Sequence, residues 1–175
     1  MSDSRYPPLP DHLRPGLKII FVGFNPSLRS AETGHHYASP SNRFWKIMHQ
    51  SGLTPRLYRA EEDGDLLGLG YGFTNIVARP SRAAADICQD EYRKGGQILK
   101  EKLEHYPPEQ VCFVGKGVYQ IFSGRRHVEW GFQADSVVAG VRDFVAPSSS
   151  GLVRMSIEQV SEIYRLLAED VLRKS

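Results

Sequence analysis

The chain has 175 residues, of which 41% are hydrophobic, and this length fits one compact domain with a real core. Its formal net charge is +2 without a long basic run, which permits a nucleic-acid partner but does not indicate one. Two distant cysteines, Cys88 and Cys112, exclude an iron–sulfur cluster or a zinc ribbon and favour reduced thiols in the cytoplasm.

The amino-terminal segment, residues 1–17, is rich in proline and is expected to lie extended on the surface. It lacks the apolar region of a secretory signal, and no segment approaches the roughly 18 apolar residues of a membrane span. Residues 18–175 are therefore expected to form a single domain and, without an obvious apolar patch, a monomer. That domain opens with 18–24, an almost wholly apolar run typical of a strand buried on both faces.

A polar loop is predicted directly after this strand. Loops at the carboxyl ends of buried strands hold ligands in open α/β folds. This loop carries an amide at Asn25, several hydroxyls, two imidazoles and Tyr37, a set that suits a planar, hydrogen-bonding ligand such as a base. Taken alone, the Asn-Pro pair is more typical of a simple turn. Adjacent histidines, His35 and His36, make a poor zinc site without a third ligand nearby, so no metal is predicted.

Strands and helices alternate along the rest of the chain. Further helices are predicted over 40–51 (capped by Ser39), 60–67, 90–106 (with Ile98, Leu99 and Leu103 inward), 116–122 and 156–172, and strands over 73–78 and 111–114, with a hairpin over 136–145 that turns at Gly140. This alternation predicts an α/β fold, a single-domain three-layer α/β/α sandwich with a mainly parallel central sheet.

The segment 147–154, with sequence PSSSGLVR, combines serines with an apolar tip. One interpretation is a flexible connection. The other is a contact with DNA, in which Leu152 acts as a wedge and the serines and Arg154 bind phosphates. The Gly-Lys-Gly at 115–117 lacks the rest of a phosphate-loop pattern, and neither a dinucleotide fingerprint nor a Gly-x-Ser-x-Gly elbow is present.

Four blocks in a fixed order resemble the mismatch-specific uracil-DNA glycosylases and the thymine-DNA glycosylases: GFNPSLRSAETGHHYASPSNRFW, GFTNIVARP, KGGQILKEKLEHYPP with VCFVGK, and PSSSGL. The resemblance runs from Lys18 to the final helix. It implies a cofactor-free, monofunctional DNA glycosylase that initiates base excision repair. Such an enzyme flips and excises uracil, and by extension thymine or other damaged pyrimidines, from mismatched duplex DNA, chiefly U:G.

The resemblance also implies roles for individual residues around the base. Asn25 would orient the hydrolytic water, and Tyr37 would stack on the flipped base. The remaining residues expected to contact the base or flipped nucleotide are Phe24 and Ser27 (through their backbone), Ser30, His36 and Asn75.

A second group of residues would hold the duplex open. Gly151 and Leu152 would enter the space that the base vacates. The residues expected to contact phosphates are Ser148, Ser149, Ser150 and Arg154.

Two residues leave part of the expected function open, one for the substrate range and one for the activation of water. Ser27 replaces the usual glycine, which leaves the substrate range open. Asp86 could assist Asn25 as a second water activator, although a surface or helix-capping role is favoured. Two rival functions also remain, a non-catalytic DNA mismatch or lesion-binding module and an enzyme of free nucleosides.

Overall fold

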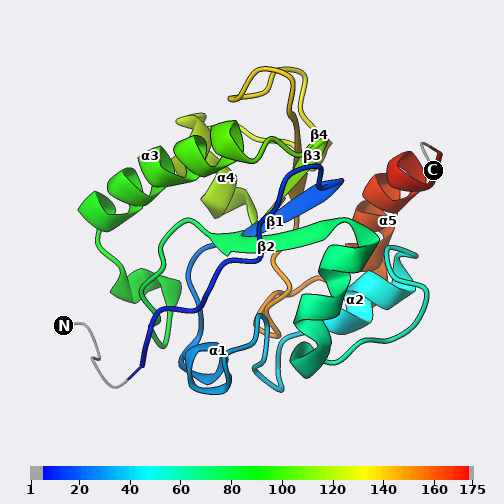
Figure 1. Cartoon of the computed structure of the whole chain (residues 1–175), viewed down its shortest axis with the longest axis horizontal. Helices are drawn as coiled ribbons and strands as arrows, with labels where there is room; N and C mark the ends of the chain where they lie inside the picture. Colours follow the sequence, from blue (N-terminus) through cyan, green and yellow to red (C-terminus); the bar gives the residue numbers. More distant parts are fainter. Residues whose placement is uncertain (1–5, 174–175) are drawn as a thin grey trace.

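A five-stranded sheet forms the middle of the molecule in the computed structural model, which describes residues 6–173 (Figure 1). In space the strands follow the order β2-β1-β3-β5-β4. Their bounds are β1 Ile19–Gly23, β2 Tyr71–Asn75, β3 Gln110–Val114, β4 Gly131–Phe132 and β5 Arg142–Ala146. Four strands are mutually parallel, and β4 alone pairs antiparallel, with β5. The prediction of a mainly parallel central sheet is confirmed.

Helices cover both faces of this sheet, as the sequence predicts. Figure 1 shows α3 and α4 on one side and α2 and α5 on the other. The helix bounds are α1 Leu28–Thr33, α2 Phe44–Gln50, α3 Gln89–His105, α4 Lys116–Ser123 and α5 Ile157–Arg173, with 3₁₀ helices η1 Ala60–Leu69 and η2 Ala84–Asp86. No helix within residues 6–173 is long and apolar enough to cross a membrane.

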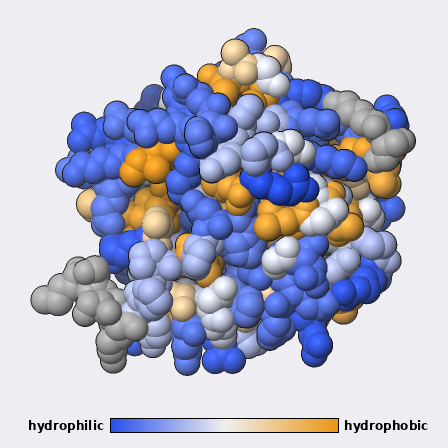
Figure 2. All heavy atoms as spheres, in the orientation of Figure 1, coloured by the Kyte–Doolittle hydropathy of each residue, from blue (hydrophilic) through white to orange (hydrophobic). Residues whose placement is uncertain are grey.

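Successive residues of each buried strand point to opposite faces of the sheet and join different cores. In β1, Phe21 belongs to the core under α2 and α5, whereas Ile20 and Val22 belong to the core under α3 and α4. All three side chains are fully buried. The continuous apolar run therefore reflects burial on both faces, as expected for a parallel strand. On the outer face seen in Figure 2, apolar side chains form small patches among hydrophilic ones.

Helix α3 packs closely against the chain that leaves β2. A Cβ built on Gly95 would lie 2.0 Å from the carbonyl oxygen of Ile76, whereas one on Gly96 would meet only the Ile76 Cδ1, at 4.0 Å. The backbone of this chain also bonds to the end of β1, because the N–H groups of Ile76 and Val77 donate to the carbonyls of Gly23 and Phe24, each at 2.9 Å. The segment after β2 is thus held between the sheet and α3.

The sequence predictions were wrong around the first loop. Residues 28–33 form helix α1, whose first turn is capped by the Ser27 hydroxyl. Helix α2 begins at Phe44 rather than at Pro40, and the Asn42 side chain accepts a hydrogen bond from the Phe44 N–H at 3.0 Å. The Ser39 hydroxyl bonds to Ser41 instead of capping a helix.

Three other predictions need correction. Strand β2 begins at Tyr71, because Gly70 alone adopts the left-handed conformation that ends η1. The hairpin over 136–145 is absent, since β5 pairs in parallel with β3 and its antiparallel neighbour β4 lies before Gly140. On α3, Leu99 and Leu103 are buried as predicted, but Ile98 is half exposed.

The amino-terminal segment is part of the folded unit. Leu9 is buried, and His12 exchanges two backbone hydrogen bonds with Phe73 of β2. These contacts correct the expectation of a purely surface segment for residues 6–17. Residues 1–5 lie outside the described part of the chain.

Candidate active site

A cavity of about 370 Å³ opens at the carboxyl edge of the sheet, where the four parallel strands end. Its walls come from the ends of β1, β2 and β3, from helix α1 and from the loop after β5. The residues expected at the base or the duplex that line it are Phe24, Asn25, Ser27, Ser30, His36, Tyr37, Asn75, Ser148, Ser149, Ser150 and Leu152. The fold therefore brings together nearly all of the residues that the sequence singled out.

Asn25 follows directly after β1, and its amide is fixed by two acceptors. Its Nδ2 donates to the Arg79 carbonyl at 2.9 Å and to the Ser81 hydroxyl at 2.7 Å. The Ser81 hydroxyl donates its own proton to the Ala83 carbonyl at 2.7 Å, so it can only accept from Asn25. This pattern dictates the orientation of the amide. The Oδ1 atom, which accepts no bond from the described residues, is free to accept one from a water in the cavity.

Tyr37 presents an aromatic wall on the other side of the cavity. Its ring stacks on Phe44 with a centroid distance of 3.9 Å and an angle of 11°. The residue has a φ of 52°, a left-handed conformation uncommon for a non-glycine residue. The indole N–H of Trp45 bonds to the Tyr37 carbonyl at 3.2 Å and so supports this conformation. Burial raises the pKa of the Tyr37 hydroxyl, which has no partner among the described residues.

The end of β1 approaches the end of β2 closely at this wall. A Cβ built on Gly23 would lie 2.7 Å from the Asn75 Oδ1 and 3.3 Å from the Tyr37 hydroxyl oxygen. Glycine at this position therefore keeps space between the two polar groups. Asn75 is half-buried and lines the cavity.

Ser27 and Ser30 form a linked hydroxyl pair at the start of α1. The Ser27 Oγ accepts a bond from the Ser30 N–H at 3.0 Å and donates to the Ser30 Oγ at 3.2 Å. The Ser30 Oγ also accepts from the Ala38 N–H at 3.1 Å. Ser27 is thus a helix cap, with a φ of −69° that any residue adopts without strain.

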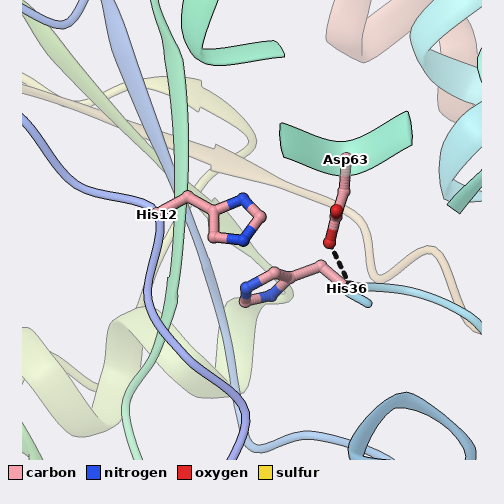
Figure 3. A group of neighbouring side chains, drawn as sticks. All are labelled: His12, His36 and Asp63. Carbon is pink, nitrogen blue, oxygen red and sulfur yellow. Dashed lines mark hydrogen bonds between the residues drawn. The ribbon is translucent and has the colours of Figure 1, made fainter. Parts of the chain in front are cut away.

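His36 lies at the back of the cavity within a buried polar group formed with His12 and Asp63 (Figure 3). Figure 3 shows the two imidazole rings close together and the Asp63 carboxylate directed at the His36 backbone, whose N–H it accepts at 2.8 Å. The other Asp63 oxygen bonds to His35 at 3.1 Å, and the His36 Nε2 bonds to the Pro10 carbonyl at 2.9 Å.

The potential ligand atoms of His12, His36 and Asp63 lie within 4.8 Å of one another, a separation at which they could share a metal ion. Both Asp63 oxygens and the His36 Nε2 already have protein partners. Only His12 has a buried nitrogen, Nδ1, without a partner in the described part of the chain. We therefore assign the group the role of fixing the segment that carries Tyr37.

The ionisation of His36 leads to a prediction about stability. Burial, opposed in part by the hydrogen bond to Pro10, lowers the pKa of His36 from 6.5 to about 4. Its contribution to stability is therefore complete above pH 6.5 and is lost as the pH falls through 4, a change of about 3 kcal/mol. The His36→Gln variant keeps a hydrogen-bond donor for the Pro10 carbonyl but cannot take up a proton in this pH range. Between pH 7 and pH 4, we expect its free energy of unfolding in urea to fall by about 3 kcal/mol less than that of the wild type. Equal losses in the two proteins would contradict this assignment.

The loop after β5 is anchored by hydrogen bonds at its base and exposed at its tip. The Arg43 backbone N–H donates to the carbonyl of Ser149, which is buried, and the Arg43 guanidinium donates to the carbonyls of Ser150 and Met155. Leu152, at the tip, is 95% exposed. A large apolar side chain held out from an anchored loop is the arrangement expected of a wedge.

Three predicted residues do not line the cavity: Asp86, Gly151 and Arg154. Gly151 is exposed beside Leu152. Asp86 is exposed in η2, and its carboxylate accepts a bond from the Ala83 N–H at 3.1 Å, which is the favoured capping role. Arg154 is exposed beyond the wedge and does not line the cavity. Three residues of the site were missed, Ser81, Arg43 and Asp63, of which only Ser81 carried a signal, because it belongs to the polar loop after β2.

Comparison with known proteins agrees with this geometry. A model of the uracil DNA glycosylase superfamily matches residues 10–170. Among solved structures, the chain resembles the solution NMR structure of a protein from Methanosarcina acetivorans that is provisionally assigned as a uracil DNA glycosylase. The TM-score is 0.63 at 21% identity, over 93% of this chain and 96% of that one, which shows a shared fold.

Proposed function

Because the chain belongs to the uracil DNA glycosylase superfamily, we propose that it excises uracil from mismatched duplex DNA, chiefly from U:G pairs, by hydrolysis of the N-glycosidic bond. The observation that carries this proposal is the orientation of Asn25, whose amide is locked with Oδ1 available to a water. A water held in this way is a placed nucleophile for the sugar carbon. The preference for mismatches is supported by the anchored wedge and by the GHHY and PSSSG blocks.

The reaction would begin with extrusion of the target nucleotide into the cavity. Unstacking costs a few kcal/mol and is easier at a mismatch, which favours U:G over U:A. The flipped base would stack on Tyr37, whose other face is supported by Phe44. Leu152 would fill the vacated space and oppose return of the base.

Bond cleavage develops negative charge on the departing uracil and positive character on the sugar. Backbone N–H groups near Phe24 and Ser27 would stabilise the base. Only an N–H group can donate to the developing negative charge, and the Phe24 carbonyl accepts a bond from the Val77 N–H instead. Asn25 would direct the water to the sugar carbon, and the proton of that water would pass to solvent. No lysine lines the cavity among residues 6–173, which supports a monofunctional enzyme that releases the base without strand cleavage. We further propose that the protein acts as a monomer in the cytoplasm.

The direct test is single-turnover release of base from labelled duplexes that contain U:G, U:A or T:G, and from single strands. We expect release to be fastest from U:G. An absence of base release from all four substrates, combined with tight binding to the U:G duplex, would favour the non-catalytic binding module instead. A borohydride-trapped adduct with DNA would contradict the monofunctional mechanism.

A wedge variant distinguishes a duplex enzyme from an enzyme of free nucleosides. Leu152→Ala removes the exposed side chain and leaves the Arg43 contacts to the loop backbone in place. We expect release from U:G duplex to fall at least about tenfold, because the flipped state loses the group that fills the stack. Release from the free nucleoside deoxyuridine serves as the control and should change far less. Equal losses on both substrates would show that Leu152 does not act as a wedge.

A further inference from the structure

An exposed tryptophan and a lysine form a pair on the carboxyl edge of the sheet, outside the cavity. The Lys116 Nζ lies 4.3 Å from the centroid of the Trp130 ring, and Trp130 is 37% exposed. A lysine over an aromatic face is a cation–π arrangement, which restrains an otherwise flexible ammonium. Neither side chain has an ion pair or a hydrogen bond with any residue in 6–173, so the ammonium remains free to bind an anion.

Topology places this pair next to the wedge loop. Lys116 opens α4 directly after β3, and the intervening Gly115 donates its N–H to the Ala146 carbonyl at 2.8 Å. A Cβ built on Gly115 would lie 3.8 Å from the Ser148 Cβ. Trp130 immediately precedes β4. Strand β4 is antiparallel to β5, so its first residue, Gly131, pairs with Val145 near the carboxyl end of β5. Both residues therefore lie on the same edge as the cavity, beside the base of the wedge loop.

We propose that Lys116 and Trp130 form a second DNA-binding site, which holds a backbone phosphate of the duplex beyond the flipped nucleotide. Lys116 supplies the charge, and Trp130 fixes the ammonium and offers its indole N–H and ring edge to the phosphate and its sugar. Phosphate contacts of this kind position the protein on the duplex without reading sequence. The inference rests on the proposed function only for its choice of duplex DNA as the ligand.

The test measures affinity for a labelled duplex with a tetrahydrofuran abasic site opposite guanine, which the enzyme cannot cleave, at several salt concentrations. Loss of one phosphate contact should lower the slope of log K against log salt by about one and weaken binding on the order of five- to tenfold. We expect both changes for Lys116→Ala. Trp130→Ala should weaken binding with a smaller change in slope, and Trp130→Phe, which keeps an aromatic face, should restore most of the affinity.

The matched control is Lys100→Ala. Lys100 is an exposed lysine in the second half of α3, the half that runs away from the carboxyl edge, and its loss should leave the slope unchanged. If Lys116→Ala behaves like Lys100→Ala while the wild-type protein still releases uracil, the second site is wrong and the proposed function stands. A wild-type protein that does not bind the duplex at all would overturn both.

Discussion

Replacement of Asn25 by alanine should reduce the single-turnover rate of uracil release from a U:G duplex by about 10²–10⁴-fold. The alanine keeps the backbone at the end of β1 but removes the amide oxygen that would hold the water. It also removes both bonds from Nδ2, to the Arg79 carbonyl and the Ser81 hydroxyl. Binding of the abasic duplex should change little, because the lost contact is to the nucleophile and not to DNA.

A companion variant separates the two effects of that change. Ser81→Ala leaves the Asn25 amide in place but removes one of the two acceptors that orient it. We expect a smaller loss than for Asn25→Ala, seen in the rate of the chemical step and not in duplex affinity. A full rate in Asn25→Ala, with the melting temperature of the variant unchanged, would place the water activator elsewhere.

The largest effect on stability is expected at Gly95 on helix α3. A Cβ at this position would lie 2.0 Å from the Ile76 carbonyl oxygen, and backbone on both sides prevents easy relief. We expect Gly95→Ala to lower the free energy of unfolding by about 3 kcal/mol, at the upper end of typical overpacking. Equilibrium unfolding in urea measures this change.

The neighbouring glycine provides a matched control. A Cβ on Gly96 meets only the Ile76 Cδ1, at 4.0 Å. Gly96→Ala should therefore show the ordinary gain from helix propensity, up to about 1 kcal/mol. Equal effects of the two substitutions would contradict the close packing of α3 on the segment after β2.

The strands were predictable because their sequences report burial directly. The runs 19–23 and 110–114 are buried along their whole length, as the predicted runs at 18–24 and 111–114 imply. The sequence predicts less well which strands pair with each other. The short strand β4 contributes two residues and pairs with a strand that the sequence had placed in a separate hairpin. Helix α1 was missed because its polar sequence shows no strong apolar period, and its stability depends on the Ser27 cap.

The candidate site was predictable where its residues follow strands along the chain. Asn25, Tyr37 and Asn75 all line the cavity. What could not be predicted is the support behind them. Ser81 orients Asn25 across a separation of 56 residues, and Asp63 holds the His36 backbone across 27. Such contacts form only after the sheet has assembled, so no local sequence pattern predicts them.

The strand order gives the carboxyl edge a definite length. Asn75 ends β2 at one side of the sheet, Asn25 and Lys116 follow the middle strands, and Trp130 precedes β4 at the other side. Four gaps between neighbouring strands, each about 4.8 Å, span roughly 19 Å. A duplex whose axis follows this edge rises about 3.4 Å per base pair, so the edge corresponds to about six base pairs. If the proposed function holds and the duplex follows this edge, a duplex shorter than about six base pairs would not reach both Asn75 and Trp130 at once.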